Sequence, residues 1–197
     1  MTLSEKGLAR LHTVLSGYVE EKALPGAVAL VAHGEDAHIE TVGTLAFDSE
    51  VPMRSDSVFR IASLTKPVVA AAAMMLVDDG VLRLDAAIDD LLPELADRRV
   101  LRHIDGDLDD TVPASRPITV EDLLTFRLGF GFGMELLPFG ESPIQVAEIE
   151  LQLKTIGPPW PPTAHSPDEW IRRLGTLPLM YQPGERWLYN TGAQVLG

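Results

Sequence analysis

The sequence predicts an α+β fold in which an antiparallel sheet is flanked by helices and joined to a helical, loop-rich region. Three observations support this fold class. An amphipathic pattern near the N-terminus precedes two strand-like segments, a nearly all-apolar helical pattern follows, and residues 129–183 are dense in Gly and Pro. We therefore divide the chain into residues 1–62, with the first helix and a β-hairpin, and residues 63–197, with the apolar helix and the loop-rich region.

The first part of the chain reads as a helix followed by a hairpin. The helix is predicted by apolar residues that recur every three or four positions, namely Leu8, Leu11, Leu15 and Tyr18. Residues 27–32 and 38–47 read as strands around a turn at 34–36, which predicts a hairpin with one face against this helix. Residues 58–61 are also strand-like, so we expect a short further strand there.

The apolar helix is the strongest structural signal in the second part. Residues 63–79 are helical in pattern and apolar on nearly every side, and Gly80 fits the position just past the helix end. A helix without a polar face has to be buried. We therefore expect this helix at the centre of the molecule.

The rest of the chain predicts short helices separated by loops. Residues 82–95 read as a loop and a short helix that ends near Pro93, and residues 96–116 as a polar, acidic stretch. Thr119, with Asp122 three residues later, predicts a capped helix over residues 119–126. Between residues 129 and 183 the pattern is irregular, apart from a helix predicted for residues 142–154.

The predicted strands are too few to form a complete β-sheet. Residues 190–197 look like the beginning of a helix, and the sequence stops there. Two or three strands are too few for a stable sheet that faces a buried helix. We therefore expect the chain to be the N-terminal portion of a longer fold.

Composition excludes several classes of function. The chain has 29 acidic and 16 basic residues, a formal charge of −13, which disfavours nucleic acid and anionic membrane surfaces as partners. It contains no Cys, so disulfides, thiolate metal sites and cysteine nucleophiles are excluded. The N-terminal residues do not follow the pattern of a signal peptide, and from this we expect a cytoplasmic protein.

The residues most suggestive of chemistry are Ser63 and Lys66. On a helix, positions three apart share a face, so the hydroxyl and the amine come within reach of each other. Such a pair can transfer acyl groups if the lysine is uncharged when it takes the serine proton, and burial disfavours its ammonium form. We expect the apolar residues that follow Lys66 to supply that burial. Alternatively, Ser63 only caps the helix.

Three blocks of sequence resemble a known family. The first block is residues 59–67, the apolar helix that follows, and residues 79–85 and 91–95; the second is residues 118–125, and the third is residues 183–190. Together these blocks resemble the serine β-lactamase-related hydrolases. Among these, the chain is most similar to class C β-lactamases, D-stereospecific peptidases and family VIII esterases. The resemblance implies a β-lactamase/transpeptidase-like fold.

The resemblance also implies roles for particular residues. Ser63 would be the acylated nucleophile and Lys66 its proton acceptor. Tyr189 would pass the proton to the leaving group and help to activate water, and Asn190 would hold the substrate carbonyl. The implied reaction takes a small-molecule ester, amide or β-lactam through an acyl-enzyme and needs no cofactor or metal.

Two departures from the family pattern leave alternatives open. The family motif has one residue between its Tyr and Asn, whereas Tyr189 and Asn190 are adjacent. Counting from Pro183 favours Tyr189 as the family tyrosine, and counting back from Gly197 would put Leu188 there; we favour Tyr189, because leucine cannot move a proton. The family's third motif is absent from this sequence. A non-catalytic fragment that binds a carbonyl ligand or a partner is therefore the alternative.

The other motifs are better explained by structural roles than by binding or catalysis. Residues 105–110 begin like a calcium loop but lack its glycine and its final glutamate, which favours a solvated acidic loop. We interpret the glycines of residues 129–133 as a flexible lid hinge. Trp160, Trp170 and Trp187 could line an acyl pocket, but packing under a lid is the commoner role.

Overall fold

The computed structural model describes residues 2–133, 140–153 and 165–197. The chain forms two compact units, Met1–Arg60 and Ile61–Gly197. In the described residues no helix has the length and apolar character needed to cross a membrane.

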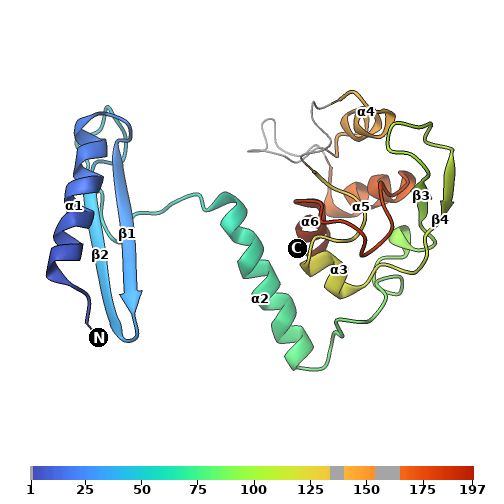
Figure 1. Cartoon of the computed structure of the whole chain (residues 1–197), viewed down its shortest axis with the longest axis horizontal. Coiled ribbons are helices and arrows are strands. Elements are labelled where there is room, and N and C mark those ends of the chain that lie inside the picture. Colours follow the sequence, from blue (N-terminus) through green and yellow to red (C-terminus); the bar gives the residue numbers. More distant parts are fainter. Residues whose placement is uncertain (1, 134–139, 154–164) are drawn as a thin grey trace. The chain divides into compact units, whose positions relative to one another are not determined.

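The first unit is a helix packed on a hairpin, as predicted. Helix α1 (Glu5–Glu20) begins at Ser4, whose Oγ accepts a hydrogen bond of 3.1 Å from the Gly7 N–H. Strands β1 (Gly26–His33) and β2 (Asp36–Gly43) pair antiparallel, from Gly26 opposite Gly43 to His33 opposite Asp36. Helix α1 lies along this hairpin and contacts β2 (Figure 1).

The second unit contains short elements around one apolar core. In chain order these are the 3₁₀ turn η1 (Ala62–Leu64), α2 (Thr65–Asp78), η2 (Pro93–Leu95), β3 (Arg99–Leu101), β4 (Thr111–Pro113), α3 (Val120–Leu124), α4 (Pro143–Glu150), α5 (Pro167–Thr176) and α6 (Thr191–Leu196). Their buried side chains form one cluster, which includes Ile88, Leu95, Ile118, Leu123, Phe130, Ile144, Leu174 and Leu188. Helix α3 packs against α6, and β3 pairs antiparallel with β4.

The prediction that the apolar helix is buried at the centre was wrong for this chain. In α2 only Ala73 is buried, while Val68 is 61% and Met75 66% exposed. Among the named elements, α2 packs mainly against α6 and against η1, the 3₁₀ turn that directly precedes α2. Burial of an all-apolar helix requires apolar partners on every side, and here they cover only a small part of its surface.

Several local predictions differ from the structure. Residues 96–116, predicted to be a polar and acidic stretch, contain the β3–β4 hairpin. Residues 129–183, predicted to be irregular apart from residues 142–154, contain α5. Residues 58–61 form no strand, and Pro93 begins a 3₁₀ turn instead of ending a helix. The expected lid hinge is a packed segment, because Phe130 is only 1% exposed. The capped helix over 119–126 is confirmed as α3, with its Thr119–Asp122 capping box.

Candidate active site

Ser63 lies on an exposed turn whose backbone is strained. It is the central residue of η1, which runs directly into α2, and its neighbour Ala62 has φ 45°. A left-handed conformation at a residue with a side chain costs about 1–3 kcal/mol, and such strain is concentrated at functional sites. Pro67 lies in the first turn of α2, where its missing N–H is tolerated. The helix start thus places Ser63 and Lys66 on one face.

The Lys66 amine contacts the Ser63 hydroxyl. Lys66 Nζ donates a hydrogen bond of 3.0 Å to Ser63 Oγ. The side chain is half-buried and not dry as expected, since the apolar residues of α2 beyond it are themselves largely exposed. The spacing prediction therefore gives the contact, while the burial predicted from the apolar run is only partial.

Tyr189 reaches the same oxygen from a distant part of the chain. Its hydroxyl donates a hydrogen bond of 2.9 Å to Ser63 Oγ, and Lys66 Nζ lies 4.8 Å from the centre of its ring. The hydrogen bond with Ser63, then the hydrogen bond and charge of Lys66, lower the pKa of Tyr189 from its ordinary value of 10.0. Two proton-carrying groups therefore converge on one hydroxyl.

The backbone conformation around Tyr189 accommodates the tyrosine and the asparagine at adjacent positions. Tyr189 forms an antiparallel bridge with Phe132, with N–H to O distances of 2.6 and 2.9 Å. Asn190 has φ 85° and ψ −56°, and the Thr191 N–H donates to the Tyr189 carbonyl at 3.2 Å. This is a γ-turn of the rare, strained kind. Leu188 is completely buried, so the tyrosine, and not the leucine, faces Ser63.

Asn190 has a different environment from the other three predicted site residues. It is 6% exposed and is the central residue of the γ-turn, directly before α6. Ser63, Lys66 and Tyr189 meet at the Ser63 oxygen near the surface, whereas the Asn190 residue is buried. The structure thus brings three of the four predicted residues together at one atom.

An aromatic cluster surrounds Tyr189. The Trp187 ring stacks on it, with centroids 5.9 Å apart and an interplanar angle of 29°. Phe126 contacts both rings, with its centroid 5.8 Å from that of Tyr189 and 5.7 Å from that of Trp187. Sequence reasoning had considered Trp187 but missed Phe126, whose φ of 59° is a structural signal that no sequence pattern displays.

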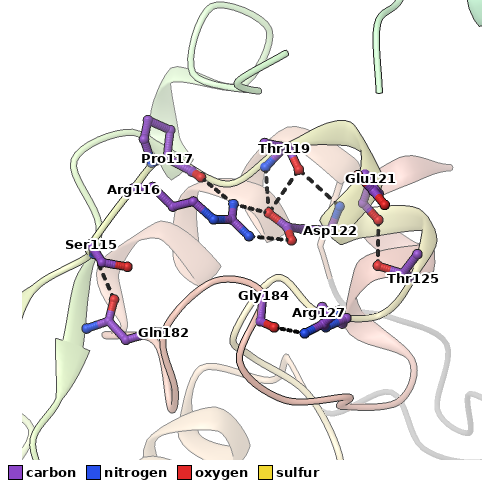
Figure 2. A network of polar contacts seen from close by, with 10 residues as sticks. All are labelled: Ser115, Arg116, Pro117, Thr119, Glu121, Asp122, Thr125, Arg127, Gln182 and Gly184. Carbon is purple, nitrogen blue, oxygen red and sulfur yellow. Dashed lines mark hydrogen bonds and ion pairs between the residues drawn. The ribbon is translucent and has the colours of Figure 1, made fainter. Parts of the chain in front are cut away.

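A network of polar contacts extends from the buried Asp122 carboxylate to the turn at Gly184 (Figure 2). Arg116 donates two hydrogen bonds, of 2.5 and 2.8 Å, to the carboxylate of Asp122. Burial raises the pKa of Asp122, but the hydrogen bonds from Arg116 and Thr119 outweigh this effect and hold it below 3.8. Arg127 binds the Gly184 carbonyl, and Arg127's own carbonyl accepts from the Gly184 N–H at 2.7 Å. The network thereby fixes the turn before the site.

The remaining candidates give no second site. The described residues contain no group of three or more His, Cys, Asp or Glu side chains placed to hold a metal ion. Trp170 is 8% exposed and belongs to the core cluster. Trp160 lies outside the residues that the structure describes.

Comparison with known proteins gives consistent matches along nearly the whole chain. The family described as Beta-lactamase matches residues 11–197. The chain is 42% identical over 175 residues to Protein Rv1367c of Mycobacterium tuberculosis, a match that covers 88% of this chain and 40% of that protein. It is 34% identical over 199 residues to esterase EstB of Burkholderia gladioli, with coverage of 96% and 43%. The chain therefore spans less than half the length of these curated relatives.

A solved structure gives the same picture of the fold. The chain superimposes on EstCE1, a hydrolase with promiscuous acyltransferase activity, with a TM-score of 0.74 and 23% identity, covering 97% of this chain and 45% of that protein. This likeness confirms the predicted α+β, β-lactamase/transpeptidase-like fold.

Proposed function

Because the chain belongs to the Beta-lactamase family, we propose that it is the nucleophile-bearing part of a serine hydrolase. The proposed substrate is a small-molecule ester, with amides and β-lactams as further members of the same reaction class. One observation carries this proposal: Lys66 Nζ and Tyr189 Oη both lie within hydrogen-bond distance of Ser63 Oγ. The name of the related esterase EstB agrees with an ester substrate.

The proposed reaction has two halves. In the first, Ser63 Oγ attacks the substrate carbonyl, its proton passes to Lys66, and Tyr189 delivers a proton to the departing alcohol or amine. Backbone N–H groups at the start of α2 stabilise the negative charge on the carbonyl oxygen. In the second half, Tyr189 takes a proton from a water molecule that attacks the acyl group, Lys66 returns its proton to Ser63 Oγ, and the carboxylic acid leaves. Asn190 is proposed to help to hold the substrate carbonyl.

Charge makes this arrangement suitable for proton transfer. A tyrosine needs a nearby cation to give up its proton near neutral pH, and Lys66 lies beside the Tyr189 ring. The lowered pKa of Tyr189 follows from these contacts. Tyr189 can then exchange a proton with Ser63 and Lys66 without a cofactor.

A covalent probe tests the proposal directly. The complete protein, as the cell makes it, is treated with a fluorophosphonate and examined by intact-mass measurement and peptide mapping. We expect one adduct on Ser63 and none in the Ser63→Ala variant. A folded protein that takes no adduct would instead favour a carbonyl-binding protein without turnover.

A further inference from the structure

The backbone before Tyr189 places a tryptophan on the side of the nucleophile. Tyr189 forms a β-bridge with Phe132, and its ring stacks on that of Trp187 two positions earlier, so these two side chains lie on one side of the segment. Leu188 is 0% exposed and lies in the core, whereas Trp187 is 58% exposed. Tyr189, on the same side as Trp187, donates to Ser63 Oγ. Trp187 therefore shares the face that meets the nucleophile.

Trp187 is held in position although it is exposed. Its ring stacks on Tyr189, and Phe126 contacts it edge-on at 62°. Two residues beside Ser63 in the chain, Ile61 and Leu64, are also exposed, by 47% and 68%. A large aromatic surface that is fixed and open to solvent is a preformed contact for a flat apolar group.

The partner of this surface follows from the position of Tyr189. In the proposed reaction Tyr189 gives a proton to the leaving group, so the leaving group lies against it. Trp187 stacks on Tyr189 and is therefore the next surface that the leaving group meets. We propose that Trp187 selects the leaving group and that the enzyme prefers esters of flat, apolar alcohols. This inference rests on the proposed function.

Two acetate esters of similar intrinsic reactivity test the preference. Benzyl acetate and ethyl acetate give the same acetyl-enzyme, so any difference between them arises before the alcohol departs. In the complete protein, we expect Trp187→Ala to lower the benzyl-to-ethyl ratio of kcat/KM about tenfold, the scale of a lost aromatic contact. Trp187→Phe should keep most of the ratio. Hydrolysis of the acetyl-enzyme should be unchanged.

A matched control uses an exposed apolar residue far from Ser63. Val81 is 69% exposed and follows the far end of α2, about 20 Å along a helix of this length from the nucleophile. Val81→Ala should leave the ratio unchanged.

Three outcomes would overturn the inference. An equal loss for both esters in Trp187→Ala would mean that Trp187 only orients Tyr189. Unchanged kcat/KM values for both esters would exclude contact with the leaving group. An altered ratio between benzyl phenylacetate and benzyl acetate, with the benzyl-to-ethyl ratio intact, would place Trp187 against the acyl group. If Ser63 takes no fluorophosphonate adduct, the proposed function fails; with an adduct, these outcomes remove the leaving-group assignment alone.

Discussion

The two polar clusters of the larger unit differ in how many partners their central group has and in how much water reaches it. The Asp122 carboxylate is buried, with a side-chain exposure of 7%, and accepts hydrogen bonds from Arg116 and Thr119. Ser63 is exposed, and Lys66 and Tyr189 converge on its single oxygen. The Asp122 cluster has its hydrogen-bonding capacity filled by the protein. The Ser63 cluster is open to a molecule that arrives from solution.

This difference matches a structural role for the Asp122 cluster and the proposed chemical role of the Ser63 cluster. A buried carboxylate loses most when a partner is removed, because its charge is then left unpaired. An exposed group can be rehydrated, so its loss changes reactivity more than folding. Substitutions in the Asp122 cluster should therefore alter stability, and substitutions in the Ser63 cluster should alter the acylation rate.

The largest expected effect is that of Lys66→Met. Methionine keeps most of the side-chain length and removes the amine that contacts Ser63. We expect the rate of fluorophosphonate labelling to fall about 10³-fold, within the range for a lost general base. The thermal midpoint should hardly change, because Lys66 is only half-buried. Labelling at the unchanged rate would remove Lys66 from the mechanism.

The next effect is that of Tyr189→Phe. This variant keeps the ring contacts with Trp187 and Phe126 and removes only the hydroxyl that donates to Ser63. We expect about a 10²-fold loss of kcat/KM for ester hydrolysis. The pH–rate profile of the wild type should contain a limb below pH 10, because the pKa of Tyr189 is lowered. The variant should lack this limb. A wild-type limb that persists in the variant would assign it to another group.

A third substitution, Asp122→Ala, should affect the opposite property. It removes the partner of Arg116 and the reciprocal cap of α3. We expect the free energy of unfolding to fall by about 2–3 kcal/mol, measured in urea. The matched control is Asp110→Ala, whose ion pair with Arg102 is about half-exposed on both sides and should cost less than about 1 kcal/mol. Equal losses of stability in the two variants would contradict a larger structural role for the buried Asp122 carboxylate.

The smallest effect is the acid sensitivity of the same carboxylate. The folded pKa of Asp122 is lowered, so its stabilising contribution is complete above its ordinary value of 3.8 and is lost as pH falls through the folded value. The Asp122→Asn variant should therefore lose less stability than the wild type over this range. Urea unfolding at a series of pH values measures the difference.

Much of the local structure was predictable because it depends on neighbours in the chain. Capping by Thr119 and the hairpin of β1 and β2 require only residues a few positions apart. The contact between Ser63 and Lys66 has the same origin, because side chains three positions apart at a helix start lie on the same face. The Tyr189 contact spans 126 positions. It was anticipated by family resemblance and not by any local rule.

The failures share one physical cause, which is dependence on distant packing. The apolar pattern of α2 says that its surface is suited to burial but not how much of it this chain covers. Helix α5 was not predicted, because the residues around it are rich in Pro. Ser166 and Pro167 nevertheless form an ordinary helix start. Phe126 contacts Trp187 and Tyr189, which are distant in the sequence, and no local pattern predicts such a contact.

The double contact at Ser63 has a consequence for when the site can react. A hydroxyl oxygen has two lone pairs, and here one accepts a hydrogen bond from the Lys66 amine and the other from the Tyr189 hydroxyl. An atom whose electron pairs are both engaged has none to share with carbon. In the proposed reaction this arrangement precedes catalysis, and the Ser63 oxygen becomes able to attack only once Lys66 accepts a hydrogen from it instead of donating one.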